Sequence, residues 1–390
     1  MNTTQGLTAR ITNKISDFPE EDWNSISPPV LENYNFFKTI DESNFEQFSF
    51  FYILVYDNKI PVGATSCFLM RFALDMTVCG PLKVIFNSIK KILPGLLMPR
   101  VLMCGLPMAA GRIGISRENN RVMGKIHECL EKIAENEKAA MIIFKDFTGD
   151  YDNILKPFLK KSFCRIESLP STDMKINFSS FNDYLKTLSR SSRDGIKRNF
   201  KKVDGKIKID LEITNALKED ILPEVYRLYL ETYEKNDIGL EKVPMEFFKN
   251  ISRNMPEEAK YFLWRIDGKI AAFALCLVRK EYFIDYYLGF DYKIAHDYYL
   301  YFIRFRDLMN WCIKNGIKKY EMGATSYEAK RRLGFSFIRL YFYLKHRNPL
   351  VNLFAGVLTS FMKPENFDPV FKKMNKTGKN YSCFPWGYTN

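Results

Sequence analysis

The chain has 390 residues, of which 46% are apolar and 26% charged, an ordinary globular composition with enough length for two or three domains. Its eight cysteines stand singly without a C-x-x-C pair, and its three histidines are too few for a His-rich metal cluster, which argues against a zinc site. Residues 1–16 are polar and no apolar run is long enough to span a bilayer. We therefore expect a cytoplasmic protein with no signal peptide and no metal.

The formal net charge of +13 indicates attraction to anions. Four kinds of partner fit this charge: the pyrophosphate of CoA, tRNA, an anionic lipid head group, and a nucleotide-linked precursor. An alternative is that lysine is abundant everywhere because the genome is rich in A and T. The charge alone leaves the partner open.

In the first half of the chain, apolar runs at 48–56 and 62–70 flank the turn Asp-Asn-Lys at 57–59, a pattern that predicts a β-hairpin. Apolar residues at helical spacing predict a helix over 117–136, and 140–144 has the pattern of a strand. The same order of elements returns in the second half, which indicates a duplicated unit.

Two segments of the first half are less clear: one lacks a recognised pattern, and the other allows two interpretations. The glycines of 104–114 do not follow a recognised phosphate-loop order, so this segment predicts an irregular substrate loop. Residues 83–97 have one apolar face opposite lysines. That segment either lies on a membrane surface or packs as a helix on its own domain.

Residues 181–203 connect the two halves. Basic side chains recur there at helical spacing, and Ile196, Phe200 and Val203 share the opposite face, which predicts an amphipathic helix. The basic face is either a solvated surface or a phosphate-binding one. For the second interpretation, the predicted phosphate-binding residues are Arg193, Lys197 and Arg198.

In the second half, apolar runs at 261–266 and 270–278 are joined by Asp-Gly-Lys, which predicts a tight hairpin turn. Residues 281–288 are rich in aromatic and branched side chains and predict a third strand. An apolar stripe then predicts a helix over 298–314, which Gly316 ends.

Three short elements follow. Residues 317–322 predict a strand, 326–333 a basic helix that ends at Gly334, and 335–344 a last strand. Beyond them, residues 350–362 are apolar but too short to span a bilayer. This C-terminal segment either packs back as a brace or contacts lipid.

Three antiparallel strands, a long helix, a strand, a short helix and a closing strand look like the acyl-transfer core of the GNAT superfamily. Within residues 320–335, Gly323, Tyr327, Lys330 and Gly334 resemble the Gly-x-x-x-Tyr-x-x-Lys-x-x-x-Gly segment of FemAB-like N-acyltransferases. Residues 288–291 match the strand end of that family, and 188–198 resemble its domain junction.

This resemblance implies a mixed α/β fold of two tandem GNAT-like domains. We expect a degenerate N-terminal domain at 1–180, a basic connecting helix at 181–204, a C-terminal FemAB-like domain at 205–348 and an extension at 349–390.

The resemblance also implies where a donor binds. In GNAT-like folds the acyl arm inserts where two core strands splay apart, and the phosphates lie near the next helix N-terminus, where free backbone N–H groups face them. Here the donor-binding residues implied are Phe290, Asp291, His296 and Tyr298. The CoA signature is missing from this loop, so acyl-CoA, acyl carrier protein and aminoacyl-tRNA all stay open as donors, and no tightly bound cofactor is expected.

Three residues are candidates for catalysis. Asp285 is either a general base or a solvent-facing strand residue. Tyr327 and Lys330 share one face of a short helix, where the phenol can protonate the leaving group and the lysine, on the exposed side, can hold a phosphate or the oxyanion. Glu321 is either a residue that orients the acceptor amine or an ordinary strand-end carboxylate.

The sequence therefore predicts an acyltransferase that moves an acyl or aminoacyl group from a thioester or ester onto an amine. The alternative is a non-catalytic protein that binds an acylated or phosphorylated ligand. A lipid-linked or nucleotide-linked acceptor, tRNA, and peripheral contact with the inner face of the membrane fit the basic charge. The oligomeric state is not predicted.

Overall fold

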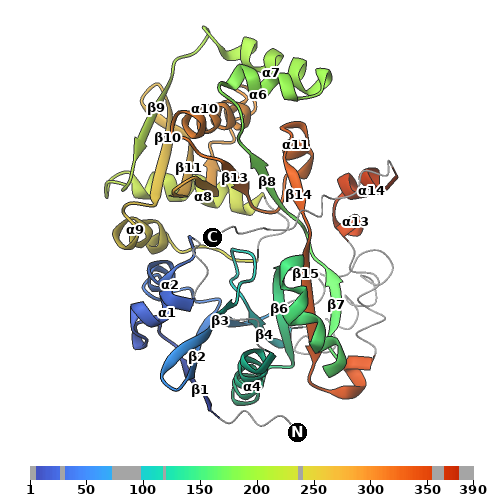
Figure 1. Ribbon diagram of the computed structural model, residues 1–390. Helices are drawn as coiled ribbons and strands as arrows, with labels where there is room; N and C mark the ends of the chain where they lie inside the picture. The colour runs from blue at the N-terminus through green and yellow to red at the C-terminus, as the bar shows by residue number, and fades with distance from the viewer. Residues whose placement is uncertain are drawn as a thin grey trace. The chain divides into compact units, whose positions relative to one another are not determined.

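The computed structural model describes residues 6–26, 31–72, 98–116, 120–235, 240–353 and 364–376. The chain forms two compact units (Figure 1). Unit 1 comprises Met1–Asp41, Phe45–Pro170 and Ile338–Asn390, and unit 2 comprises Glu42–Asn44 and Ser171–Phe337. The segment 83–97, with its two interpretations, lies outside the described residues, as does most of the apolar stretch 350–362.

Unit 1 is built on an eight-stranded sheet with the order β1-β2-β3-β4-β6-β15-β7, and β5 pairs with β3. Strands β4 and β6 pair in parallel, and the other neighbours pair antiparallel. The bounds are β1 Leu7–Thr12, β2 Ser49–Asp57, β3 Ile60–Arg71, β4 Arg100–Cys104, β5 Gly114–Ile115, β6 Met141–Thr148, β7 Cys164–Glu167 and β15 Leu340–His346.

The helices of unit 1 include one long amphipathic helix. Helix α4 buries Val122, Ile126, Leu130 and related residues in a core shared with the sheet, as its apolar spacing predicts. The bounds are α1 Glu20–Ile26, α2 Tyr34–Asp41, α4 Asn120–Asn136, α5 Asp152–Leu155, α13 Pro364–Phe367 and α14 Pro369–Lys376.

Unit 2 repeats this plan on a seven-stranded sheet with the order β14-β8-β13-β12-β11-β10-β9. Strands β12 and β13 form its parallel pair. The predicted Asp-Gly hairpin turn is present, because Asp267 and Gly268 both have positive φ, at 50° and 78°. The bounds are β8 Ser171–Lys175, β9 Ile209–Thr214, β10 Ala259–Ile266, β11 Lys269–Arg279, β12 Tyr282–Phe290, β13 Lys319–Met322 and β14 Ser336–Ile338.

The helices of unit 2 cover both faces of its sheet. Helices α6, α7 and α10 share one core with the sheet (Figure 1). On the other face, α8 approaches β12 closely: a Cβ on Gly289 would lie 2.6 Å from the backbone carbon of Leu228. The bounds are α6 Phe181–Thr187, α7 Arg190–Val203, α8 Leu222–Glu234, α9 Met245–Asn254, α10 Leu300–Lys314 and α11 Tyr327–Arg332.

The two units exchange one strand each. The sequence assigns β8 to the first domain and β15 to the second, but β8 lies between β13 and β14 in unit 2, while β15 lies between β6 and β7 in unit 1. The compact units also divide at residue 170 rather than 180. Residues 181–203 form α6 and α7, which pack into the core of unit 2 and are not a free-standing connector. The apolar pattern of a strand sets its buried face but not the sheet that it joins.

Candidate active site in the second unit

The parallel pair β12 and β13 separates partway along its length. Pairing runs from Tyr282 opposite Lys319 to Asp285 opposite Met322, and there β13 ends while β12 continues to Phe290. The register of β12 against β11 shifts beside Asp285, so the bulge lies at the same point. No strand in the described part of the chain pairs with this side of β12 beyond Asp285. An extended ligand can therefore pair with that open strand edge.

Lys330 lies at the end of this strand pair. It follows β13 in the short helix α11, and its ammonium donates hydrogen bonds to the carbonyls of Gly323 and, at 3.3 Å, Ala324. The predicted exposed position is wrong, because the side chain is only 4% exposed. Burial lowers the pKa of the Lys330 ammonium to about 7. The charge of this lysine is thus held near its titration point at neutral pH.

Tyr327 shares the buried face of α11 with Lys330, as the spacing predicts. Its ring is 1% exposed and packs on Phe337, with ring centroids 5.8 Å apart. The Lys330 ammonium lies 6.0 Å from the centroid of the Tyr327 ring. In contrast, Arg331 and Arg332 are exposed and pair with Glu328.

Asp285 points into the core that faces α10. Its carboxylate accepts hydrogen bonds from Arg304 at 2.6 Å and from the Tyr320 hydroxyl at 3.0 Å. The interpretation as a solvent-facing strand residue is therefore wrong, because the Asp285 side chain is fully buried. Arg304 was missed by the sequence analysis. Its signal is a charged residue four positions from both Leu300 and Leu308, within an apolar helix face.

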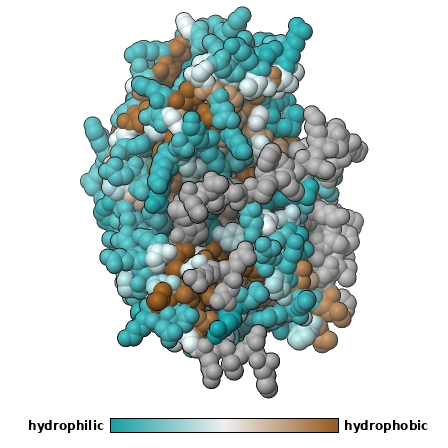
Figure 2. Space-filling view, in the orientation of Figure 1, coloured by the Kyte–Doolittle hydropathy of each residue, from teal (hydrophilic) through white to brown (hydrophobic). Residues whose placement is uncertain are grey.

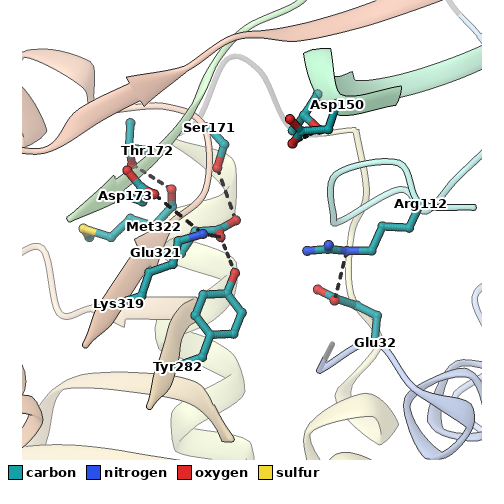
Figure 3. A network of polar contacts seen from close by, with 11 residues as sticks. Glu32, Arg112, Asp150, Ser171, Thr172, Asp173, Tyr282, Lys319, Glu321 and Met322 are labelled. Carbon is teal, nitrogen blue, oxygen red and sulfur yellow. Dashed lines mark hydrogen bonds and ion pairs between the residues drawn. The ribbon is translucent and has the colours of Figure 1, made fainter. Parts of the chain in front are cut away.

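Two further carboxylates, those of Asp173 and Glu321, lie together on the other face of the sheet (Figure 3). Glu321 accepts hydrogen bonds from the Tyr282 hydroxyl and from Ser171 Oγ, the latter at 3.3 Å. Lys319 Nζ lies 3.6 Å from Asp173 and 3.7 Å from Glu321, and the two carboxylates face each other across β8 and β13. Burial raises the pKa of Asp173, and the charge of Glu321 adds to the effect. Sequence reasoning missed Asp173 because β8 was assigned to the other domain.

The loop after β12 is where the sequence predicts that the donor phosphates bind. Many of its backbone N–H groups form hydrogen bonds within the loop itself. Phe290 is buried, and Asp291 accepts hydrogen bonds from the amides of Lys293, Ile294 and Ala295. The amide of Tyr298 bonds to Ile294, while His296 is exposed. Several of the backbone N–H groups expected to face a phosphate thus already have acceptors, and Asp291 adds negative charge.

Helix α7 packs beside α10 and carries a basic surface. Arg193, Lys197 and Arg198 form no salt bridge among the described residues, and the surface over α7 is mostly hydrophilic in Figure 2. Lys202 donates a hydrogen bond at 2.7 Å to the Tyr299 hydroxyl, just before α10 begins. The apolar face of α7 is buried, as its spacing predicts.

In unit 1 the equivalent strand edge is covered by the chain itself. Strand β4 ends at Cys104, and the amide of Gly111 donates to the Asp146 carbonyl of β6 at 2.9 Å. A Cβ at Gly111 would lie 2.2 Å from the Lys145 carbonyl oxygen, so only glycine allows this approach. Arg112 of this loop forms an ion pair at 3.6 Å with the buried Glu32 of unit 1, and the two side chains point toward each other in Figure 3. Unit 1 therefore has no open strand edge at this position among its described residues.

Comparisons with known proteins agree with this architecture. The model of the FemAB-like family, described as peptidoglycan biosynthesis/recognition, matches residues 106–368. FemX has a similar fold, with a TM-score of 0.56 and 12% identity over 86% of this chain and 98% of FemX. A conserved Bacteroides thetaiotaomicron protein of unknown function gives 0.52 and 12%, over 86% and 99%.

A tandem GNAT protein from clavulanic acid biosynthesis gives a TM-score of 0.50 and 8% identity, over 88% of this chain and 99% of its own. None of the curated proteins matches the sequence. The predicted fold of two tandem GNAT-like domains is confirmed. Within the described residues, no helix is both long enough and apolar enough to cross a bilayer.

Proposed function

Because the chain belongs to the FemAB-like family, whose model matches residues 106–368, we propose that it transfers an acyl or aminoacyl group from a thioester or ester donor to an amine. The observation that carries this proposal is the buried ammonium of Lys330 beside the open edge of β12. A donor arm that pairs with this edge brings its carbonyl to the end of the strand pair, where the ammonium lies.

Direct transfer needs no covalent enzyme intermediate. The acceptor amine attacks the donor carbonyl, a C–N bond forms, and the C–S or C–O bond of the donor breaks. Lys330 stabilises the oxyanion that develops on the carbonyl, since a buried positive charge is most effective where water is excluded. The amine proton leaves to a base, and the Tyr327 hydroxyl gives a proton to the leaving group. Asp285 is hydrogen-bonded inside the core, so we assign it to holding the site rather than to taking this proton.

The carboxylates of Asp173 and Glu321 are the better candidates for binding the acceptor amine. Both lie on one face of the sheet, and the raised pKa of Asp173 suits a group that accepts a proton. Given the family description, we propose that the amine belongs to a peptidoglycan precursor, lipid-linked or nucleotide-linked, and that the protein works in the cytoplasm at the inner face of the membrane. Acyl-CoA, acyl carrier protein and aminoacyl-tRNA are the donors to test.

The basic surface of α7 is proposed to bind the donor phosphates. Replacing Lys197 and Arg198 together by glutamate should weaken binding of both bulk aminoacyl-tRNA and CoA. It should also flatten the salt dependence of tRNA binding, by roughly 0.7–0.9 in the log–log slope for each phosphate that the variant no longer neutralises. Binding is measured by fluorescence anisotropy between low and physiological salt.

A control with a single charge reversal is Lys249→Glu, which changes an exposed, paired lysine of α9. It should leave affinity and slope at parental values. Parental affinity and slope in the α7 double variant would mean that the basic surface is only a solvated helix face.

A non-catalytic binding protein is the second candidate, and the internally bonded loop 291–300 favours it. One experiment separates the two. Ligands that co-purify with the protein are identified by mass spectrometry, and the donor so found is incubated with candidate amines. Repeated turnover supports the transferase. A donor that is bound but never transferred, with every acceptor class tested, supports the binding protein.

A further inference from the structure

The ion pair between Asp285 and Arg304 is unusual for its burial. Both side chains are 0% exposed, and the closest nitrogen–oxygen distance is 2.6 Å. Asp285 Oδ1 and two guanidinium nitrogens of Arg304 have no hydrogen-bond partner among the described residues. Burying such a pair adds little stability, because the loss of hydration is comparable to the mutual attraction of the charges. Packing therefore does not explain why these charges lie in an apolar core.

The position of the pair relates it to Lys330. Asp285 is the last residue of β12 that pairs with β13, and its partner is Met322. The next residue, Gly323, accepts a hydrogen bond from the Lys330 ammonium. A strand advances about 3.3 Å per residue. The carboxylate and the ammonium therefore belong to the same end of the same strand pair.

The charged groups around Lys330 act in opposite directions. Burial is the main cause that lowers the pKa of Lys330, to about 7. Asp285 on β12 and Glu321 on β13 raise it, while Arg304 on α10 lowers it, and the influence of Asp285 exceeds that of Arg304. On its own helix α11, Lys330 has the uncharged Tyr327 beside it.

The remaining titratable groups around the pair stay neutral. Burial raises the pKa of each of them, so none carries a charge near pH 7; they are Cys276 on β11, Tyr301 and Cys312 on α10, and Tyr320 on β13. Among the described residues, the Asp285–Arg304 pair thus supplies the charges next to Lys330 on the core side of the sheet.

We propose that Asp285 and Arg304 are positioning residues whose ion pair sets the charge of Lys330 from the core side of the sheet. The effect on turnover rests on the proposed transferase function, whereas the effect on the lysine does not. While the pair is intact, the carboxylate keeps part of the Lys330 population protonated at neutral pH. Removal of either partner changes that fraction, in opposite directions.

The test is a direct titration of Lys330 by NMR. The full chain is labelled with ¹³C,¹⁵N-lysine, and the Lys330 signal is assigned by its absence in Lys330→Met. Asp285→Asn should lower the pKa of Lys330 by about one unit, which is a tenfold change in the ratio of neutral to protonated lysine at a given pH. Arg304→Met should raise it. No acyl donor is present, so failure here is distinct from failure of the transferase proposal.

The double variant Asp285→Asn with Arg304→Met guards against unfolding of the single variants, because it buries no unpaired charge. It should lower the pKa of Lys330 by less than Asp285→Asn does, since the stronger influence is removed together with the weaker one. Arg331→Met, an exposed change on the same helix, should leave the titration unchanged. A Lys330 pKa equal to the parental value in the double variant and in each single variant that folds overturns the proposal.

Discussion

Lys330→Met should lower turnover by about a hundredfold or more while the protein stays folded. Methionine keeps the length and flexibility of the side chain but removes the charge that is proposed to stabilise the oxyanion. A hundredfold loss corresponds to about 2.7 kcal/mol of transition-state stabilisation. The carbonyls of Gly323 and Ala324 lose a donor, but Gly323 and Ala324 are exposed and water can replace it. The measurement is kcat with the donor identified by mass spectrometry.

Arg331→Met is the matched control for this prediction. It removes a positive charge one residue away, where the side chain is exposed and paired with Glu328. Exposed ion pairs contribute about 0–1 kcal/mol, so neither turnover nor folding should change noticeably. If Lys330→Met and Tyr327→Phe both transfer at the parental rate, these residues are structural and the proposed site is incorrect.

Gly289→Ala should destabilise unit 2 by about 3 kcal/mol, near the upper end for overpacking a core. The new Cβ would lie 2.4 Å from the Phe273 ring and within 2.7 Å of the backbone of Leu228. Since a backbone cannot rotate away, α8 must move off β12. The measurement is the midpoint of urea unfolding, followed by tryptophan fluorescence, to which Trp264 and Trp311 of unit 2 contribute.

Gly195→Ala is the control for the glycine prediction. It adds the same methyl group within α7, where no atom lies within 4 Å of the new Cβ. Alanine favours a helix interior by up to about 1 kcal/mol over glycine, so this variant should unfold at a slightly higher urea concentration. An unchanged midpoint for Gly289→Ala would show that α8 does not approach β12 so closely.

Local patterns predicted most elements but not how they pair. The Asp267-Gly268 turn, the helix that ends before Gly316 and the helix that carries Lys330 follow from short-range signals. The predicted last strand at 335–344 instead forms two strands, β14 and β15, that belong to different sheets. The alternation of their side chains does not specify which strand each of them pairs with.

The candidate site was predicted in part, for a similar reason. A motif of matched spacing points to Tyr327 and Lys330, and the structure buries both on one helix face. The charge of Lys330 itself depends on residues distant in sequence, such as Asp285 and Arg304. Asp173 joins Glu321 only because β8 crosses to the second sheet. Helical spacing and strand alternation carry no information about such contacts.

The late position of the exchanged strand β15 in the chain determines when unit 1 can finish folding during translation. The sheet of unit 1 has no strand between β6 and β7 until residues 340–346 have left the ribosome. At roughly 5–20 residues per second, the delay after residue 170 is on the order of ten seconds or more. The nascent N-terminal half therefore exposes two unpaired strand edges while unit 2 is being made, which is when a chaperone would be needed. A premature stop codon ahead of β15 would therefore remove one strand from the sheet of the first unit and leave β7 without its partner.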